Sequence, residues 1–309
     1  MPEPVSVRNP AGFIFGCPRS GTTLLRRIID AHPGAAAPPE TNWIPKLYRD
    51  IPHDRPMTDA AIAALLSYRR FKRMKISRAE LEAILAGGPI GFADFVSAIY
   101  DLYGARRGKH VVVDKTPAYG LQIPLLHALW PRARFVHLVR DGRDVCLSMR
   151  TWRKTAKNLE KYPTWPDYPV ATIAAFWRRR VEISRADGAA LPYGAYREFA
   201  FERLVAAPEA AVREICGPLG LPFDARMMAF NEGRRQSAEA QGATANSAWL
   251  APTPGRRDWR TQLEPQDVAM FEAVAGDALV AFGYELSGLV ADPDAHRVAE
   301  LARKAVAED

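Results

Sequence analysis

The sequence predicts an α/β protein in which a parallel β-sheet is flanked by helices. Residues 12–17 form a short apolar segment, and the helical stripe of apolar residues that follows it ends at Pro33-Gly34. Residues 111–114 and 134–139 are two further apolar segments, and each of them also leads into a short helical pattern. Strands that alternate with helices in this way favour a parallel sheet that is covered on both faces.

A helical insertion is predicted between the first strand–helix unit and the second. It spans about residues 51–108 and contains three segments with apolar residues at three- and four-residue spacing, at 58–71, 77–86 and 92–103. We expect these helices to cover the carboxyl ends of the strands, and with them the active site. After the third strand, Asp141 is placed to cap the next helix.

The carboxyl-terminal half supplies one more strand and most of the remaining helices. The pattern predicts a helix at 170–186, a strand at 193–199, a helix from near Pro208, a helix at 265–282 and a loosely attached polar helix at 293–309. A stretch with little periodicity, at about 231–260, is expected to form a lid or substrate loop. The whole chain, 1–309, is expected to fold as one domain.

Composition places the chain among folded globular proteins. Hydrophobic residues make up 48% and charged residues 25% of the 309 residues, which excludes a disordered, collagen-like or coiled-coil chain. The apolar runs are far shorter than the roughly 20 residues that span a bilayer. Because the amino terminus also lacks a secretory pattern, we expect a cytoplasmic protein.

Charge and cysteine content limit the kinds of ligand. The formal charge of +7 favours an anionic partner, but it does not choose between a phosphate-bearing small ligand and nucleic acid. The three cysteines have neither zinc-site nor disulfide-framework spacing.

The most informative segment is a glycine-containing loop between the first strand and its helix. Gly16 and Gly21 have the spacing of the phosphate-binding motif GxxxxGK[ST], whose backbone amides and helix N-terminus hold a phosphate. Thr22 stands where that motif has lysine, and the basic residue is Arg19, inside the loop. A nucleoside triphosphatase uses that lysine on the β- and γ-phosphates. The loop is therefore P-loop-like, suited to a phosphate but not to ATP.

The loop CPRSGTTLLRRIIDAHP, together with the PPETNWIP that follows it, resembles the PAPS-dependent sulfotransferase superfamily. It is most similar to the bacterial and protein-tyrosine-specific members. The resemblance implies the sulfotransferase fold, 3′-phosphoadenosine 5′-phosphosulfate (PAPS) as donor, 3′,5′-ADP as product and no metal. It also implies that the 5′-phosphosulfate is held by the loop residues Arg19, Ser20, Gly21, Thr22 and Thr23.

A second block, RFVHLVRDGRDVCLS, looks like the family's 3′-phosphate motif. In that motif an arginine at a strand end and a serine eight residues later bind the phosphate that distinguishes this donor, and Arg140 and Ser148 match. An arginine fork also suits a phosphate on chemical grounds. Taken alone, a strand-end arginine beside acidic neighbours is more typical of a surface ion pair.

Sulfuryl transfer, like phosphoryl transfer, needs one base and a few cations. Glu40 matches the catalytic glutamate of the tyrosine-specific members, so the resemblance implies that it is the general base; the competing interpretation is a solvated glutamate or a helix cap. Lys115 matches a lysine that helps to stabilise the transition state in those relatives, and Arg19 would add positive charge. Asp114 ends an apolar run like a Walker B strand, or it pairs with Lys115 or Arg19.

The resemblance weakens toward the carboxyl terminus. The block FERLV resembles the family's YEDLV, but Phe201 replaces the tyrosine that usually contacts the nucleotide, so stacking can survive while a hydroxyl hydrogen bond cannot. The block GRRDW looks like the late segment near the 3′-phosphate, with Arg256 or Arg257 as the contact. Thr244 or Ser247 is the candidate counterpart of a serine that assists catalysis in some relatives.

The sequence therefore predicts a sulfotransferase that moves a sulfuryl group from PAPS to an acceptor hydroxyl, with Glu40 as base. Two alternatives stay open: a P-loop kinase or nucleotide hydrolase, and a non-catalytic polyanion-binding protein, which the charge and the Trp/Lys-rich stretch 152–165 favour. For the enzyme, neither a nucleic-acid partner nor a membrane span is expected. The acceptor, whether a small molecule, glycan, lipid or peptide, and the oligomeric state, including a homodimer, are left open.

Overall fold

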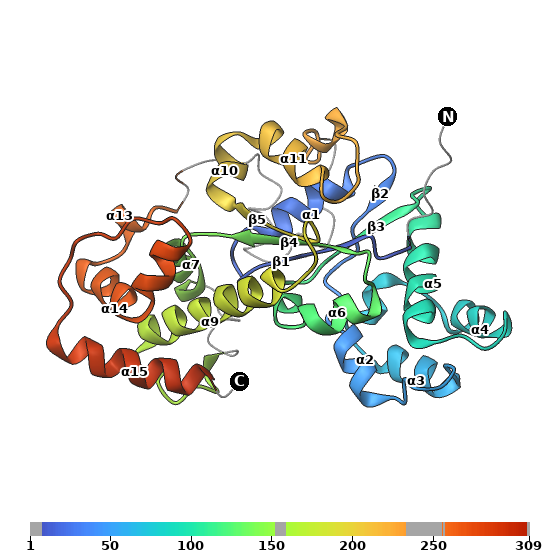
Figure 1. Ribbon diagram of the computed structural model, residues 1–309, viewed down its shortest axis with the longest axis horizontal. Helices are drawn as coiled ribbons and strands as arrows, with labels where there is room; N and C mark the ends of the chain where they lie inside the picture. Colours follow the sequence, from blue (N-terminus) through green and yellow to red (C-terminus); the bar gives the residue numbers. More distant parts are fainter. Residues whose placement is uncertain (1–7, 152–158, 233–254, 256, 308–309) are drawn as a thin grey trace.

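The computed structural model describes residues 8–151, 159–232, 255 and 257–307 of the chain. In these residues one sheet has the strand order β2-β3-β1-β4-β5, and each neighbouring pair is parallel (Figure 1). The strands are β1 (Gly12–Phe15), β2 (Ala35–Ala36), β3 (Val111–Lys115), β4 (Arg134–Val139) and β5 (Tyr196–Ala200). The predicted parallel α/β fold is confirmed, and β2 is a strand that the sequence analysis did not predict.

The central strands are buried on both faces, which explains why they are apolar throughout. Every residue of β1 and β3 is buried. The register places Ile14 beside Lys115 and Phe15 beside His137. Because the strands are parallel, the loops that follow β3, β1 and β4 meet at one edge of the sheet, with β1 in the middle.

Alternate side chains of the strands pack against two separate layers of helices. Phe13 and Phe15 lie on one face, which we call the Phe13 face, and Ile14 lies on the other. The Phe13 face packs with α2 (Ile44–Asp50), α5 (Phe92–Ala105) and α6 (Ile123–Leu129). The other face packs with α1 (Thr22–Asp30), α10 (Phe201–Ala206) and α11 (Pro208–Cys216).

The predicted helical insertion is present and packs mainly on the Phe13 face. Besides α5 it contains α3 (Asp59–Ser67), the 3₁₀ helix η1 (Phe71–Met74) and α4 (Arg78–Ala86). α4 begins with a capping box, in which Ser77 and Glu80 exchange hydrogen bonds. Arg70, immediately before η1, brings the insertion to the carboxyl edge of the sheet through its contact with Glu40.

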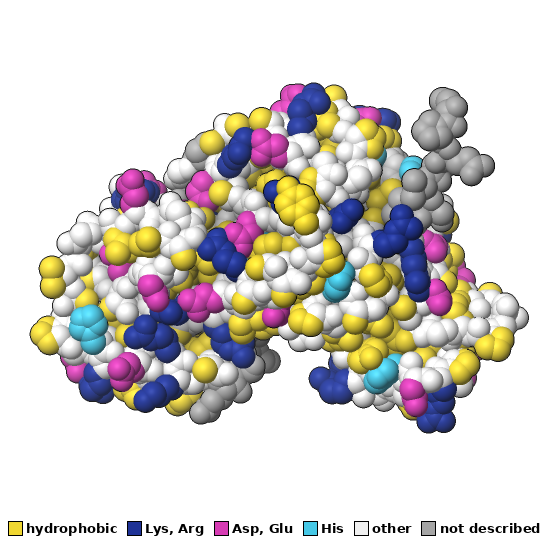
Figure 2. All heavy atoms as spheres, in the orientation of Figure 1, with side chains coloured by type: hydrophobic (Ala, Val, Ile, Leu, Met, Phe, Trp, Pro, Cys, Tyr) yellow, Lys and Arg dark blue, Asp and Glu magenta, His cyan; other side chains and the backbone are white. Residues whose placement is uncertain are grey.

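The carboxyl-terminal helices form a second cluster beside the sheet. They are α7 (Gly142–Arg150), α9 (Pro169–Ala189), α13 (Trp259–Gln262), α14 (Pro265–Ala281) and α15 (Pro293–Ala307). Asp141 caps α7 as predicted, because its side chain accepts a hydrogen bond from the Arg143 amide. Two further 3₁₀ helices are η2 (Pro117–Leu121) and η3 (Ala225–Met227). Figure 2 shows the surface hollowed between the lobe of α14 and α15 and the lobe of α2 and α3.

The expectation that the last helix is loosely attached is wrong. Val298, Ala299, Ala302 and Val306 are buried in the same apolar cluster as residues of α9 and α14. These positions recur at three- and four-residue spacing, so a helix that is polar in composition still presents a continuous apolar stripe.

We predict that Val298→Ala lowers the free energy of unfolding by about 2 kcal/mol, because two methyl groups leave a packed site. Val298 is 1% exposed, whereas Val290, in the segment before α15, is 93% exposed. Val290→Ala is the matched control, and its effect should stay within about 0.5 kcal/mol. Urea unfolding followed by circular dichroism measures both variants, and equal midpoints would contradict the packing of α15.

Candidate active site

The loop between β1 and α1 has the geometry of a phosphate-binding loop. Gly21 has a φ of 86°, and a Cβ there would lie 2.3 Å from the Phe201 ring, so this position requires glycine. At Gly16 a Cβ would lie 2.2 Å from the carbonyl oxygen of Leu138. Ser20 is fully buried, and its Oγ finds no hydrogen-bond partner in the part of the chain that the structure describes. A bound anion is the kind of group that satisfies such a hydroxyl.

Three arginines converge at this loop. Arg19 Nε donates a hydrogen bond of 2.7 Å to Ser148 Oγ. Burial, together with the charges of Arg257 and Arg140, lowers the pKa of Arg19 to about 10. Arg140 donates to Asp144 over 3.1 Å, while its buried Nε has no partner among the residues described. Cations that repel one another in this way are stabilised by an anion.

The predicted donor-site residues are therefore brought together, with one difference in arrangement. Arg140 and Ser148 come from the end of β4 and from α7, and Arg19 reaches them from the loop after β1. The sequence analysis assigned Arg19 to the sulfuryl end of the donor, whereas the structure places its guanidinium on Ser148, at the predicted 3′-phosphate pair.

Phe201 lies beside the loop of the predicted donor site. It is the first residue of α10, and its ring packs directly over Gly21. The guanidinium carbon of Arg140 lies 4.5 Å from the centre of the ring, which is a cation–π contact. The structure thus places Phe201 beside the loop, and its predicted contact with the nucleotide stays a prediction.

The late Gly/Arg/Trp segment docks on α7. The amide and the indole Nε1 of Trp259 donate hydrogen bonds of 3.0 Å to Asp144 and Asp141, respectively, which holds the segment against the first turn of α7. Arg257 donates to Thr151 Oγ1 over 3.3 Å, at the other end of that helix. Most of the predicted lid, about 231–260, together with Arg256, Thr244 and Ser247, falls on residues 233–254 and 256, which lie outside the described residues.

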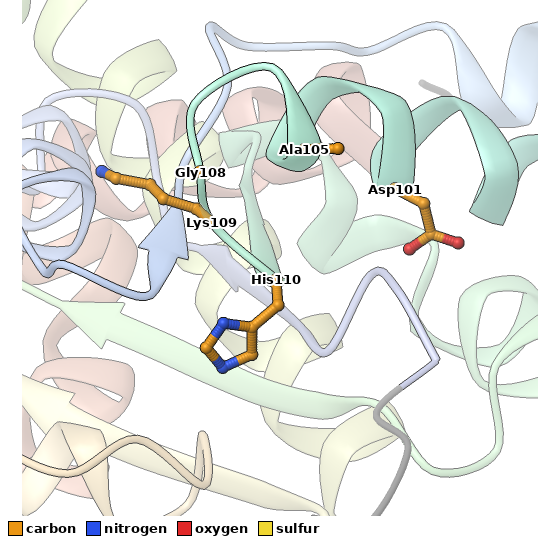
Figure 3. Close-up of a pocket in the computed structure, with 5 residues that line it drawn as sticks. All are labelled: Asp101, Ala105, Gly108, Lys109 and His110. Atoms are coloured by element: carbon orange, nitrogen blue, oxygen red, sulfur yellow. The ribbon is translucent and has the colours of Figure 1, made fainter.

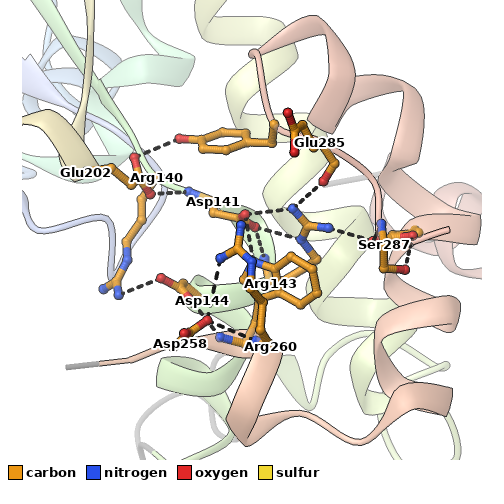
Figure 4. A network of polar contacts seen from close by, with 12 residues as sticks. Arg140, Asp141, Arg143, Asp144, Glu202, Asp258, Arg260, Glu285 and Ser287 are labelled. Atoms are coloured by element: carbon orange, nitrogen blue, oxygen red, sulfur yellow. Dashed lines mark hydrogen bonds and ion pairs between the residues drawn. The ribbon is translucent and has the colours of Figure 1, made fainter. Parts of the chain in front are cut away.

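Arg143 is a buried residue that the sequence analysis missed. It is 1% exposed, donates to both carboxylate oxygens of Asp141, to Glu272 over 2.6 Å, and to the carbonyl of Glu285 (Figure 4). This network fixes Asp141 and so the start of α7, next to Arg140. The available signal was the alternation of charges in RDGRD, which by itself does not distinguish a buried network from a surface one.

The predicted catalytic pair lies at the end of β3. Lys115 Nζ donates a hydrogen bond of 2.6 Å to Glu40 Oε1 and one of 3.3 Å to Thr23 Oγ1. Arg70, which the sequence analysis did not identify, donates to the other carboxylate oxygen, Glu40 Oε2, over 2.8 Å. Glu40 is therefore neither a free solvated side chain nor a helix cap, and it lies in contact with Lys115 as predicted.

Charge sets the protonation of this pair. Burial alone would raise the pKa of Glu40, but Lys115 and Arg70 together lower it to about 2. Burial lowers the pKa of Lys115, which is 1% exposed, and the Glu40 carboxylate opposes that effect. Glu40 is therefore ionised at neutral pH, but it is a weak base as long as both cations hold it.

Asp114 has a structural role that differs from both interpretations offered for it. Its carboxylate accepts hydrogen bonds from the hydroxyls of Thr41, Thr116 and Tyr100, and Thr41 also contacts the hydroxyl of Tyr119. The predicted pairing with Lys115 is limited to the attraction between the two charges, because the Lys115 ammonium donates its hydrogen bonds to Glu40 and Thr23, and Arg19 Nε donates to Ser148. By anchoring Thr41, Asp114 fixes the residue that follows Glu40.

A hollow elsewhere on the molecule lies apart from this site. It is lined by Asp101, Ala105, Gly108, Lys109 and His110, where α5 ends and β3 begins (Figure 3). β3 runs from Val111 to Lys115, so the hollow lies at the opposite edge of the sheet from the donor loop. Within the described residues, no group of three or more His, Cys, Asp or Glu side chains is placed to hold a metal ion, and no helix is long and apolar enough to span a membrane.

Comparisons with known proteins agree with this architecture. A family model described as the Sulfotransferase family matches residues 10–225. Nodulation protein NoeE of Sinorhizobium fredii is 27% identical over 295 residues, which cover 89% of this chain and 66% of NoeE. Protein-tyrosine sulfotransferase A of Caenorhabditis elegans is 25% identical over 226 residues, or 71% of this chain and 52% of that protein. The solved sulfotransferase domain of the Synechococcus olefin synthase is 23% identical, with a TM-score of 0.59 over 96% of this chain and 95% of that domain.

The family match spans well over half of the 309 residues, so the chain belongs to the sulfotransferase family, and the predicted membership is confirmed. The likeness to the olefin synthase domain shows that the fold is shared. The chain spans only half to two thirds of the length of these two curated relatives. Their activities as whole proteins therefore reach this chain as proposals.

We predict that substitution of Glu40 lowers the free energy of unfolding by more than substitution of its partner Lys115. Glu40→Gln leaves the buried Lys115 ammonium without its carboxylate and should lower the free energy of unfolding by about 3 kcal/mol. Lys115→Met leaves Glu40 paired with the half-exposed Arg70 and should cost no more than about 1 kcal/mol. Guanidinium unfolding at pH 7 compares the two variants, and a reversed order would show that Glu40 does not compensate the Lys115 charge.

Proposed function

We propose that the protein transfers a sulfuryl group from PAPS to the hydroxyl of an acceptor. The observation that carries this proposal is the arrangement of two charged groups along one edge of the sheet. Arg19, Arg140 and Arg257 converge at the ends of β1 and β4, and the Glu40–Lys115 pair lies at the end of β3. The ends of β3 and β4 are separated by about 10 Å, the width of two strand spacings. The first group suits donor phosphates, and the second suits an acceptor hydroxyl.

The donor-site residues fit PAPS on several counts. Arg140 and Ser148, with Arg19 and Arg257 nearby, would hold the 3′-phosphate, and loop residues 20–23 would hold the 5′-phosphosulfate. The buried Ser20 Oγ and Arg140 Nε, which find no partner among the described residues, supply donors for these anions. Phe201 offers an aromatic face to the nucleotide. Bound PAPS would supply an activated sulfuryl group on a phosphate leaving group.

Lys115 connects the donor loop with the base. Its ammonium lies between Glu40 Oε1 and Thr23 Oγ1, so an anion held by the loop competes with Glu40 for this cation. As Lys115 is drawn toward the loop, Glu40 becomes a stronger base. Glu40 then takes the proton of the acceptor hydroxyl while the acceptor oxygen bonds to sulfur, and the bond from sulfur to the 5′-phosphate oxygen breaks to leave 3′,5′-ADP. Lys115 stabilises the charge on the sulfuryl oxygens.

The two alternative functions gain less support. A kinase or nucleotide hydrolase would use Asp114 toward a magnesium ion, but this buried carboxylate already accepts hydrogen bonds from three hydroxyls, and the loop lacks the motif lysine. On the face drawn in Figure 2, Lys and Arg side chains are interspersed with Asp and Glu and do not merge into one basic surface. Part of the Trp/Lys-rich stretch, 152–158, lies outside the described residues.

The proposal names the acceptor only by its chemical class, a molecule with a free hydroxyl group. The protein-tyrosine sulfotransferase relative supports a hydroxyl on a peptide, and the proposal also includes hydroxyls of a glycan, a lipid or another small molecule. Membership of the sulfotransferase family supports sulfuryl transfer, and the acceptor hydroxyl is part of this proposal. A homodimer and a cytoplasmic location stay predictions from the sequence.

We predict that Arg140→Ala weakens 3′,5′-ADP binding by about 10- to 100-fold, because a charge-assisted contact to the 3′-phosphate is lost. Binding of 5′-AMP, which lacks that phosphate, should change little. Arg134→Ala, at the exposed start of the same strand, is the matched control and should leave both affinities unchanged. Isothermal titration calorimetry measures these affinities. Equal 3′,5′-ADP affinities for wild type and Arg140→Ala would rule out the assigned phosphate contact.

We predict that Glu40→Gln lowers PAPS turnover by about 10²- to 10⁴-fold, because the proton of the acceptor loses its base. Release of 3′,5′-ADP can be followed with water as the acceptor, before an organic acceptor is known. The affinity for 3′,5′-ADP should be retained, which shows that the variant is folded. Full turnover by Glu40→Gln would remove Glu40 from the chemistry.

A further inference from the structure

The Glu40 carboxylate accepts hydrogen bonds from two cationic side chains, one from the sheet and one from the helical insertion. Lys115, at the end of β3, binds Oε1 over 2.6 Å, and Arg70, at the edge of the helical insertion, binds Oε2 over 2.8 Å. The Lys115 side chain is 1% exposed, that of Glu40 29% and that of Arg70 39%. The carboxylate thus lies between a buried cation on the donor side and a more exposed cation on the opposite side.

Arg70 is held in place by aromatic packing that also fixes the Glu40 loop. It immediately precedes η1, in which Phe71 is fully buried. The Phe71 ring packs edge-on against Trp43, with ring centres 5.5 Å apart, and Trp43 follows Glu40 by three residues. The distance between the Arg70 backbone and the Glu40 loop is therefore set by a buried contact.

We propose that Arg70 is a positioning residue, which holds Glu40 Oε2 so that Oε1 is presented to the acceptor proton. This inference rests on the proposed role of Glu40 as base. When Lys115 is drawn to the donor, Arg70 becomes the remaining cation on the carboxylate and keeps it from rotating. The helical insertion, and not the sheet alone, then sets the orientation of the base.

The charged groups that face Glu40 come from two elements. Lys115 of β3 and Arg70, just before η1, both lower the pKa of Glu40. The positive charge of Arg26 in α1 in turn lowers the pKa of Lys115. Removal of Arg70 takes away one cation, so the pKa of Glu40 should rise from about 2 toward its ordinary value. The acidic limb of the pH–turnover profile should move to higher pH by the same amount.

The test compares Arg70→Gln and Arg70→Lys with Arg69→Gln, a control at the adjacent, exposed arginine. PAPS turnover is measured with water as acceptor, and 3′,5′-ADP affinity is measured by calorimetry. Arg70→Gln should lower kcat by about 10- to 100-fold, since a misplaced catalytic group loses its alignment. Its 3′,5′-ADP affinity and melting temperature should match those of the control. Arg70→Lys should recover part of kcat.

Two further measurements separate positioning from a structural role. A ¹³C NMR titration of the Glu40 carboxyl should show a raised pKa in Arg70→Gln and no change in Arg69→Gln. In a Glu40→Gln background, Arg70→Gln should cause no additional loss, because it acts through Glu40.

Each negative outcome has a separate meaning. Unchanged turnover in Glu40→Gln would remove the proposed base and the inference with it. If Glu40→Gln is impaired while Arg70→Gln behaves like Arg69→Gln, the role of Arg70 alone is overturned. Equal additional losses from Arg70→Gln in both backgrounds would also overturn it.

Discussion

The buried ammonium of Lys115 is the constraint around which the proposed catalytic site is arranged. A cation without access to water needs a counter-charge nearby, and Glu40 supplies it over 2.6 Å. Glu40 reaches this place because the residue after it, Thr41, is anchored to the buried Asp114. The polar cluster of Thr41, Thr116, Tyr100 and Asp114 therefore explains the position of Glu40, the proposed base.

On the predicted donor side the guanidinium groups of Arg19, Arg140 and Arg257 lie close enough together to repel one another. Burial and two neighbouring guanidinium groups lower the pKa of Arg19, so the folded chain carries unfavourable repulsion that a dianionic ligand relieves. The network of Asp141, Arg143 and Glu272 keeps α7 fixed under this repulsion. Lys115 donates hydrogen bonds to both Thr23 and Glu40, and through this connection the proposed donor would change the basicity of Glu40.

Much of this arrangement could be predicted from the sequence, because loops with short motifs follow the strands directly. The positions of Glu40, Lys115, Arg140 and Ser148 followed from the motifs that they belong to. Arg70 could not be predicted, since it lies thirty residues from Glu40 in an insertion without a motif, and only tertiary packing of Phe71 on Trp43 brings it back. Composition also misled the prediction for α15, where the apolar stripe consists largely of alanine and valine. β2, with two residues, is too short to give a periodic signal.

The central claim is that the crowded arginines form a site for a nucleotide with a 3′-phosphate. The most direct measurement is a calorimetric titration of the protein with 3′,5′-ADP, 5′-AMP and Mg·ATP, the first two in the presence of EDTA. The account predicts that 3′,5′-ADP binds at least about 10-fold more tightly than 5′-AMP, because the additional phosphate gains charge-assisted contacts. A preference for Mg·ATP, or equal affinities for 3′,5′-ADP and 5′-AMP, would contradict it.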